Sequence, residues 1–145
     1  MPPITRAKVI IEAVTSADLA ARRARRKPLE DAVAALESDL KQRYPQLDIL
    51  ALNITSNDNP ALELRSIKVN QKYRGSGVGT QVIDEIKEFA QRHRLPVTLS
   101  PAPDYGKKEA LHRFYRRHGF RYNRGRYADY RYTSPFAATM LWRPE

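Results

Sequence analysis

The sequence predicts a single domain, residues 1–145, of the α/β (α+β) class, with helices packed against a mixed β-sheet. Segments rich in Val, Ile and Leu alternate with segments whose apolar residues recur at helical spacing. A turn-forming run at residues 56–60 joins two consecutive predicted strands, which favours an antiparallel hairpin. A purely parallel sheet therefore fits less well.

The N-terminal third predicts a strand followed by two helices. Residues 7–14 are rich in Val and Ile and predict the strand, after which Ser16 would cap a short helix. This helix would run into a cluster of basic residues at 22–27 and end before Pro28. Apolar residues recur every three or four positions over residues 29–44, which predicts the second helix.

The remaining elements follow in a mixed order. We expect strands at 47–54, 61–69, 96–99, 120–122 and 139–142, and helices at 80–93 and 107–118. Residues 100–106 would form a loop, and the stretch rich in Tyr and Arg before the last strand would form a long loop or an irregular hairpin.

A glycine-rich turn lies between the strand at 61–69 and the helix at 80–93. It carries Gly75, Gly77 and Gly79 at alternate positions after Arg74. Without Cβ atoms, backbone N–H groups can approach an anion closely at a helix start, where the helix dipole also favours negative charge. The turn therefore predicts a binding site for phosphate or pyrophosphate, although a tight structural connection has the same pattern.

Composition restricts the class of protein. The formal net charge is +10 and the sequence pI is about 10.1, which predicts attraction to anions. Cysteine is absent, which excludes disulfides, thiolate metal sites and cysteine nucleophiles, and three scattered histidines indicate no metal site. The mean hydropathy is −0.64, and neither a long apolar run nor a signal-like N-terminus is present. We therefore expect a cytoplasmic protein, not a membrane protein.

Two motifs in the right order resemble the GNAT superfamily of acyl-CoA-dependent N-acyltransferases. The first runs from Ser66 through Arg74-Gly75-Ser76-Gly77-Val78-Gly79, and the second is Tyr115-Arg116-Arg117-His118-Gly119-Phe120. The resemblance covers residues 61–122 and implies a mostly antiparallel mixed sheet. It also implies acetyl-CoA as the donor substrate and a primary amine as the acceptor.

The resemblance also implies which residues contact the donor. The strand before the loop would pair with the pantetheine arm, and the loop would hold the pyrophosphate. The cofactor-binding residues so implied are Ile67, Lys68, Val69, Arg74, Gly75, Ser76, Gly77, Val78, Gly79 and Thr80. Where many relatives carry Asn, seven residues before the tyrosine, this chain has Lys108, which could reach a phosphate of the donor.

Two residues are the catalytic candidates. Glu63 lies six residues before Val69, roughly 20 Å along an extended strand, and would be the general base that accepts the amine proton. In the alternative interpretation, Glu63 is a solvent-facing residue paired with Arg65 or Arg131. Tyr115 matches the family tyrosine that protonates the departing thiolate; its alternative is a core aromatic. His112 and His118 are expected to be surface residues.

The acceptor is not specified by any motif. The basic charge disfavours a polycationic acceptor and favours a protein, peptide or small-molecule amine, or an amine carried on nucleic acid such as aminoacyl-tRNA. A non-catalytic nucleic-acid-binding module and a regulatory CoA-binding protein are the alternatives from other classes. We expect a monomer or a homodimer.

Overall fold

The computed structural model describes residues 3–55, 59–101, 108–125, 129, 131 and 140–145. These residues belong to two compact units, Met1–Ala32 and Val33–Glu145. All five described strands lie in the second unit. The single-domain organisation stays a prediction.

The N-terminal region is one long helix, α1 (Pro3–Arg43), and not the predicted strand and two helices. The prediction of a strand at residues 7–14 was wrong because Val and Ile stabilise a strand only when another strand pairs with it. No described strand pairs with this segment. Ala and Arg, both strong helix formers, dominate residues 17–26, and Pro28 lies inside the helix despite the hydrogen bond that it removes.

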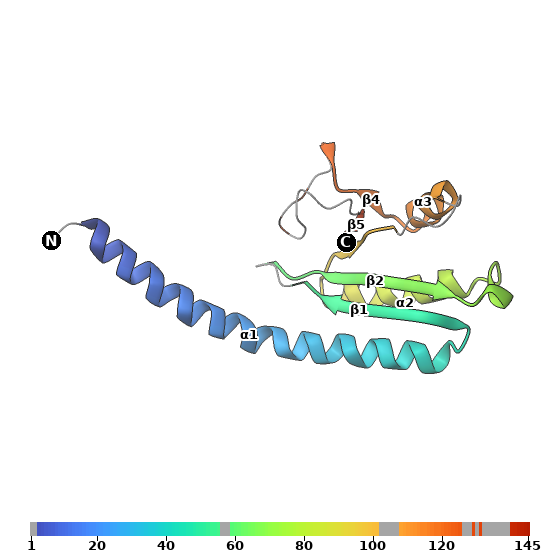
Figure 1. The fold of residues 1–145 in the computed structure, drawn as a ribbon, viewed down its shortest axis with the longest axis horizontal. Helices are drawn as coiled ribbons and strands as arrows, with labels where there is room; N and C mark the ends of the chain where they lie inside the picture. The colour runs from blue at the N-terminus through green and yellow to red at the C-terminus, as the bar shows by residue number, and fades with distance from the viewer. Residues whose placement is uncertain (1–2, 56–58, 102–107, 126–128, 130, 132–139) are drawn as a thin grey trace. The chain divides into compact units, whose positions relative to one another are not determined.

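A mixed, mostly antiparallel sheet forms the centre of the second unit, as predicted. Its strands are β1 (Leu47–Ile54), β2 (Leu62–Val69), β3 (Val97–Leu99), β4 (Arg121–Tyr122) and β5 (Met140–Trp142). These five described strands are arranged in the order β1-β2-β3-β5-β4, and among them only β2 and β3 run parallel. Figure 1 shows β1 and β2 side by side as the predicted hairpin.

Helix α2 (Val78–Arg92) follows the glycine loop and lies against β2 (Figure 1). Its predicted apolar face is buried, with Val82 and Ala90 fully covered and Phe89 6% exposed. The last turn of α1 reaches α2, because the Arg43 guanidinium and the Tyr44 hydroxyl both donate hydrogen bonds to Glu85. The C-terminal end of α1 and the part of α2 around Glu85 therefore lie side by side within this unit.

The register of the hairpin separates two faces. Directly paired residues share a face, so Leu50 with Ile67 and Leu52 with Leu64 belong to one face, which carries most of the buried side chains. The opposite, open face carries Ile49 with Lys68, Ala51 with Ser66 and Asn53 with Glu63. These two faces matter because the candidate site draws side chains from both.

A register shift interrupts the hairpin at Arg65. Leu64 pairs with Leu52 and Ser66 pairs with Ala51, so Arg65 is the extra residue of a β-bulge. A bulge bends its strand and increases the local twist. The ladder between β2 and β3 covers only Leu62–Leu64 with Val97–Leu99. Beyond Leu64, β2 therefore continues without β3 beside it.

Helix α3 (Lys108–Arg117) and the short helix η1 (Gln71–Tyr73) complete the described elements. Gly119 ends the α3 region with a φ of +89°, the left-handed conformation that favours glycine. The predicted turn at 56–60, the loop at 100–106 and the stretch before β5 lie partly outside the described residues.

Candidate active site

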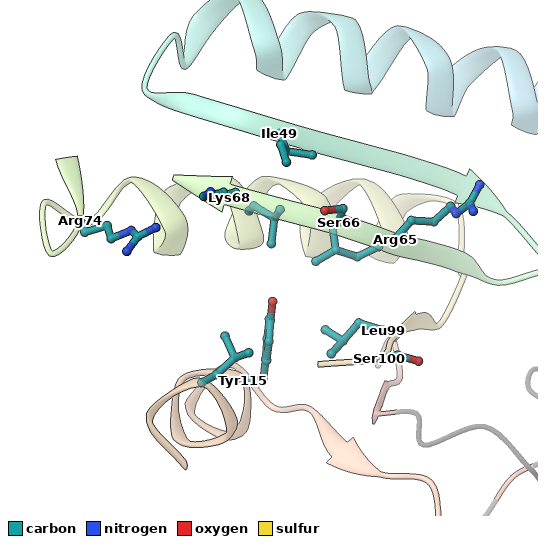
Figure 2. A pocket seen from close by; sticks show the side chains of 11 residues that line it. Ile49, Arg65, Ser66, Lys68, Arg74, Leu99, Ser100 and Tyr115 are labelled. Carbon is teal, nitrogen blue, oxygen red and sulfur yellow. The ribbon is translucent and has the colours of Figure 1, made fainter. Parts of the chain in front are cut away.

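A hollow of about 270 Å³, here called the strand hollow, lies where β2 leaves β3. Leu64 and Ile67 line it from the buried face, whereas Ser66 and Lys68 line it from the open face. Leu99 and Ser100 line it from the end of β3, and Tyr115 lines it from α3 (Figure 2). The strand hollow is therefore reached by side chains from both faces of the sheet.

A second hollow of about 440 Å³, the loop hollow, lies between the glycine loop and α3. Gly75, Gly77 and Gly79 line one part of it, and Phe114 lines another. The two hollows share four lining residues, which are Ile67, Arg74, Leu111 and Tyr115. They therefore adjoin one another, with Tyr115 at the junction.

The backbone of the glycine loop requires glycine at two positions. Gly75 and Gly77 have φ values of +80° and +90°, and a Cβ atom on either would meet no heavy atom within 4 Å. The space beside these two residues is therefore open. Gly79 differs, because its Cβ would stand 3.5 Å from the Phe114 ring. At this distance an added Cβ would make an ordinary van der Waals contact, so α3 packs beside the loop here without requiring glycine.

The loop opens α2 with free backbone donors. Gly77 is the N-cap and makes no side-chain capping bond, and the first intrahelical bond runs from the Gln81 N–H to the Gly77 carbonyl at 3.0 Å. The N–H groups of Val78, Gly79 and Thr80 precede it and have no partner within the helix. An open space, free N–H groups and the helix dipole fit an anionic group such as a pyrophosphate.

Tyr115 is buried, with 5% of its surface exposed, and packs between the rings of Phe114 and Phe120 at centroid distances of 5.3 and 5.8 Å. Its hydroxyl points from α3 toward β2 (Figure 2). Among the described residues, no group hydrogen bonds with this hydroxyl. Burial raises the pKa of Tyr115 to about 12, so the phenol stays protonated at neutral pH.

Glu63 lies on the open face of β2, beside Thr98 of β3. Its side chain is 39% exposed, and its Oε1 atom lies 3.7 Å from Nε of Arg65. The alternative partner, Arg131, instead pairs with Asp129 at 2.7 Å. Glu63 lines neither hollow, but Ser66 and Lys68 of its own face line the strand hollow.

The predicted donor-binding residues fall into four groups. Most line the loop hollow, and Lys68 lines the strand hollow. Ser76 lines neither, because its N–H and its hydroxyl both donate to the Tyr73 carbonyl. Lys108 is the first residue of α3, and its side chain lies outside the described part of the structure.

His118 is a site neighbour that the sequence did not indicate. The expectation that it is exposed was wrong, since its side chain is only 12% exposed. Its Nε2 lies 3.5 Å from the Thr80 hydroxyl and its Nδ1 lies 3.6 Å from Asp84 Oδ1. Burial lowers the pKa of His118, which favours a neutral ring joining the end of α3 to the start of α2. These contacts are tertiary, so no local pattern predicts them.

His112 is also covered in part, because the Tyr122 hydroxyl lies 2.6 Å from its Nε2. Across the described ranges, no group of three or more His, Asp or Glu side chains is arranged to hold a metal ion. In the same ranges, no helix combines the length and the apolar character needed to cross a membrane.

A family model described as an acetyltransferase (GNAT) domain matches residues 46–122, which is more than half of the chain. The matched residues include the glycine loop, helix α3 and strand β2, which lines both hollows. No curated protein matches the sequence.

Solved structures show distant likeness. The anti-CRISPR protein AcrVA5 is 24% identical, with 64% of this chain and 86% of that chain covered and a TM-score of 0.45. Ard1 from Thermoplasma volcanium is 20% identical, with coverages of 77% and 79% and a TM-score of 0.46. AtaTR bound with acetyl-CoA is 12% identical, with both coverages 71% and a TM-score of 0.46.

Proposed function

This chain belongs to the GNAT acetyltransferase family, and we propose that it transfers an acetyl group from acetyl-CoA to a primary amine by direct attack in a ternary complex. We further propose that the acceptor is a protein, peptide or small-molecule amine. The observation that carries the proposal is the position of Tyr115, whose protonated hydroxyl stands where the loop hollow meets the strand hollow.

The described residues fit acetyl-CoA as the donor substrate. The free N–H groups at the start of α2 would hold the pyrophosphate, and Arg74, which lines both hollows, adds positive charge. The edge of β2 at residues 67–69 lies beyond the ladder with β3 and is available to pair with the pantetheine arm. Acetyl-CoA supplies an activated thioester carbonyl, for which the strand hollow provides space.

The acceptor nitrogen must be neutral before it attacks, since a protonated amine has no free lone pair. We propose that Glu63 accepts the amine proton, directly or through a water molecule. Its place on the open face, which also carries Ser66 and Lys68 of the strand hollow, supports this role. The new bond joins the amine nitrogen to the acetyl carbon, and the bond from that carbon to the CoA sulfur breaks.

Tyr115 is proposed to stabilise the departing thiolate. Its pKa of about 12 exceeds the ordinary thiol pKa of about 8.5, so complete proton transfer to the sulfur is uphill. Donation of a charge-assisted hydrogen bond from the phenol is therefore its larger contribution. The thiolate can then take its proton from solvent, which leaves free CoA and the N-acetylated amine as products.

Labelled acetyl-CoA and a panel of amines test the proposal. We expect transfer of the label to at least one amine, with initial rates that fit a sequential and not a ping-pong scheme. Glu63→Gln is expected to lower kcat about a hundredfold at neutral pH, with a smaller loss at high pH where the amine deprotonates unaided. A ping-pong pattern, or an unchanged pH profile in this variant, would contradict the proposed roles.

The high positive charge favours two alternatives. In the first, the acceptor is an amine carried by nucleic acid, such as aminoacyl-tRNA. In the second, the protein is a non-catalytic nucleic-acid-binding module on the same fold. Adding aminoacyl-tRNA to the amine panel separates these possibilities. Label on the aminoacyl group identifies the first, whereas binding without any transfer identifies the second.

A further inference from the structure

A row of cationic and aromatic side chains covers the surface of α3 and β4 away from the candidate active site. Arg113 and Arg116 are one turn apart on α3, whereas Leu111 and Tyr115 line the hollows from the opposite side of the helix. Both arginines are exposed. Within the described part of the chain, neither forms an ion pair, so no described carboxylate neutralises their charges.

Contacts between α3 and β4 extend this row. His112 lies one turn before Arg116, and its ring meets the Tyr122 ring edge-on at a centroid distance of 5.1 Å. The guanidinium of Arg124, which is exposed, lies 4.7 Å from the centre of the Tyr122 ring. Figure 1 shows α3 and β4 as neighbours. We call the five residues Arg113, Arg116, His112, Tyr122 and Arg124 the basic-aromatic track.

We propose that the basic-aromatic track binds the sugar-phosphate backbone of a nucleic acid strand. Guanidinium groups form paired hydrogen bonds with phosphate oxygens, and the exposed Arg124 guanidinium over the Tyr122 ring offers a planar cation on which a base can stack. The formal net charge of +10 attracts a polyanion from a distance. The residues of the track line neither hollow, so this proposal stands or falls independently of acetyl transfer.

A matched pair of triple variants tests the track. Arg113→Gln, Arg116→Gln and Arg124→Gln together remove three charges from the track. The control combines Arg23→Gln, Arg25→Gln and Arg92→Gln, which removes three exposed arginine charges elsewhere. None of the six residues lines either hollow, so acetyl-CoA should raise the Tm of both variants as in the unmodified protein.

Binding of a short single-stranded RNA, the same DNA sequence and a duplex is measured by anisotropy over a range of salt concentrations. We expect the track variant to bind at least about tenfold more weakly at low salt, and the slope of log K against log salt to fall by about 2 for three lost phosphate contacts on a single strand. The control should retain clearly tighter binding than the track variant. Preference among the three nucleic acids identifies the strand type.

Three results would overturn the proposal. The first is no binding of any nucleic acid at low salt. The second is equal weakening in both triple variants, which would mean that total charge and not the track determines binding. The third is equally tight binding of poly-glutamate at the same salt concentration, which would assign the surface to an acidic protein. Because these measurements need no acetyl-CoA, failure of the proposed transferase activity does not affect them.

Discussion

Tyr115 combines two properties that sequence spacing does not reveal together. It is a buried aromatic that packs on Phe114 and Phe120, as the structural alternative expected. It also presents its hydroxyl to the junction of the two hollows (Figure 2). Packing fixes the ring while burial keeps the phenol protonated. The core role and the proposed catalytic role are therefore compatible in one side chain.

Tyr115→Phe removes the hydroxyl and keeps the buried ring. We expect kcat to fall about tenfold to a hundredfold, because the thiolate loses its hydrogen-bond donor, while the Kd for acetyl-CoA changes little. Single-turnover kinetics and calorimetric titration measure the two quantities. Tyr122→Phe is the matched control, since it removes a hydroxyl that contacts His112 away from both hollows. Equal kcat values for both variants would remove Tyr115 from the mechanism.

The glycine loop and α2 act as one element. The loop supplies positive φ values at Gly75 and Gly77, and α2 supplies the first-turn N–H groups and the dipole. Because α2 buries its apolar face in the core, these donors keep a fixed direction. An anion site of this kind requires the helix and the loop together, and the sequence predicted both from adjacent patterns.

Gly77→Asp tests this element. In the unmodified protein, acetyl-CoA at about a hundred times its Kd should stabilise the fold by about 2.7 kcal/mol and raise the Tm by several degrees. The aspartate would bring backbone strain at a φ of +90° and a carboxylate into the open space, so the shift should nearly disappear.

Gly125→Asp is the control for this measurement. Gly125 also has a positive φ, of +61°, and a Cβ there also meets no atom within 4 Å, but it lies outside the glycine loop. This variant carries the same charge change and the same kind of strain, so it should keep the Tm shift produced by acetyl-CoA. An equal shift in both variants would count against the loop as the donor site.

At the scale of the whole molecule, the boundary between the two compact units follows Ala32, although helix α1 continues through that position. The unit Val33–Glu145 contains the sheet, α2, α3 and both hollows. Its share of α1 contributes Val33 and Leu40 to the core, at 3% and 0% exposure. The fold of this unit therefore needs the last turns of α1.

Removal of residues 1–32 should leave a folded protein whose Tm lies within a few degrees of the full chain, because the second unit keeps its core. Helical content measured by circular dichroism should decrease. A longer deletion that also removes residues 33–40 takes away two buried side chains and should destabilise the fold by at least about 2–5 kcal/mol. Similar melting curves for the two deletions would contradict the proposed boundary.

Local patterns in the sequence determined the hairpin, the glycine loop, α2 and α3, because each depends on neighbouring residues: turn formers, absent Cβ atoms, or apolar residues at helical spacing. They also determined the family, since the two motifs lie within these elements. The prediction of a strand at residues 7–14 was wrong because Val and Ile are compatible with both a helix and a strand. A strand would have formed there only with a partner strand beside it.

Only the tertiary structure decided how the site is assembled. The bulge at Arg65 and the short ladder between β2 and β3 open the strand hollow, and neither leaves a pattern in one strand alone. The packing of Phe114 beside Gly79 brings α3 to the loop, which places Tyr115 at the junction and covers His118. Such contacts join residues far apart in the chain, so their free energy is gained only when the whole core forms.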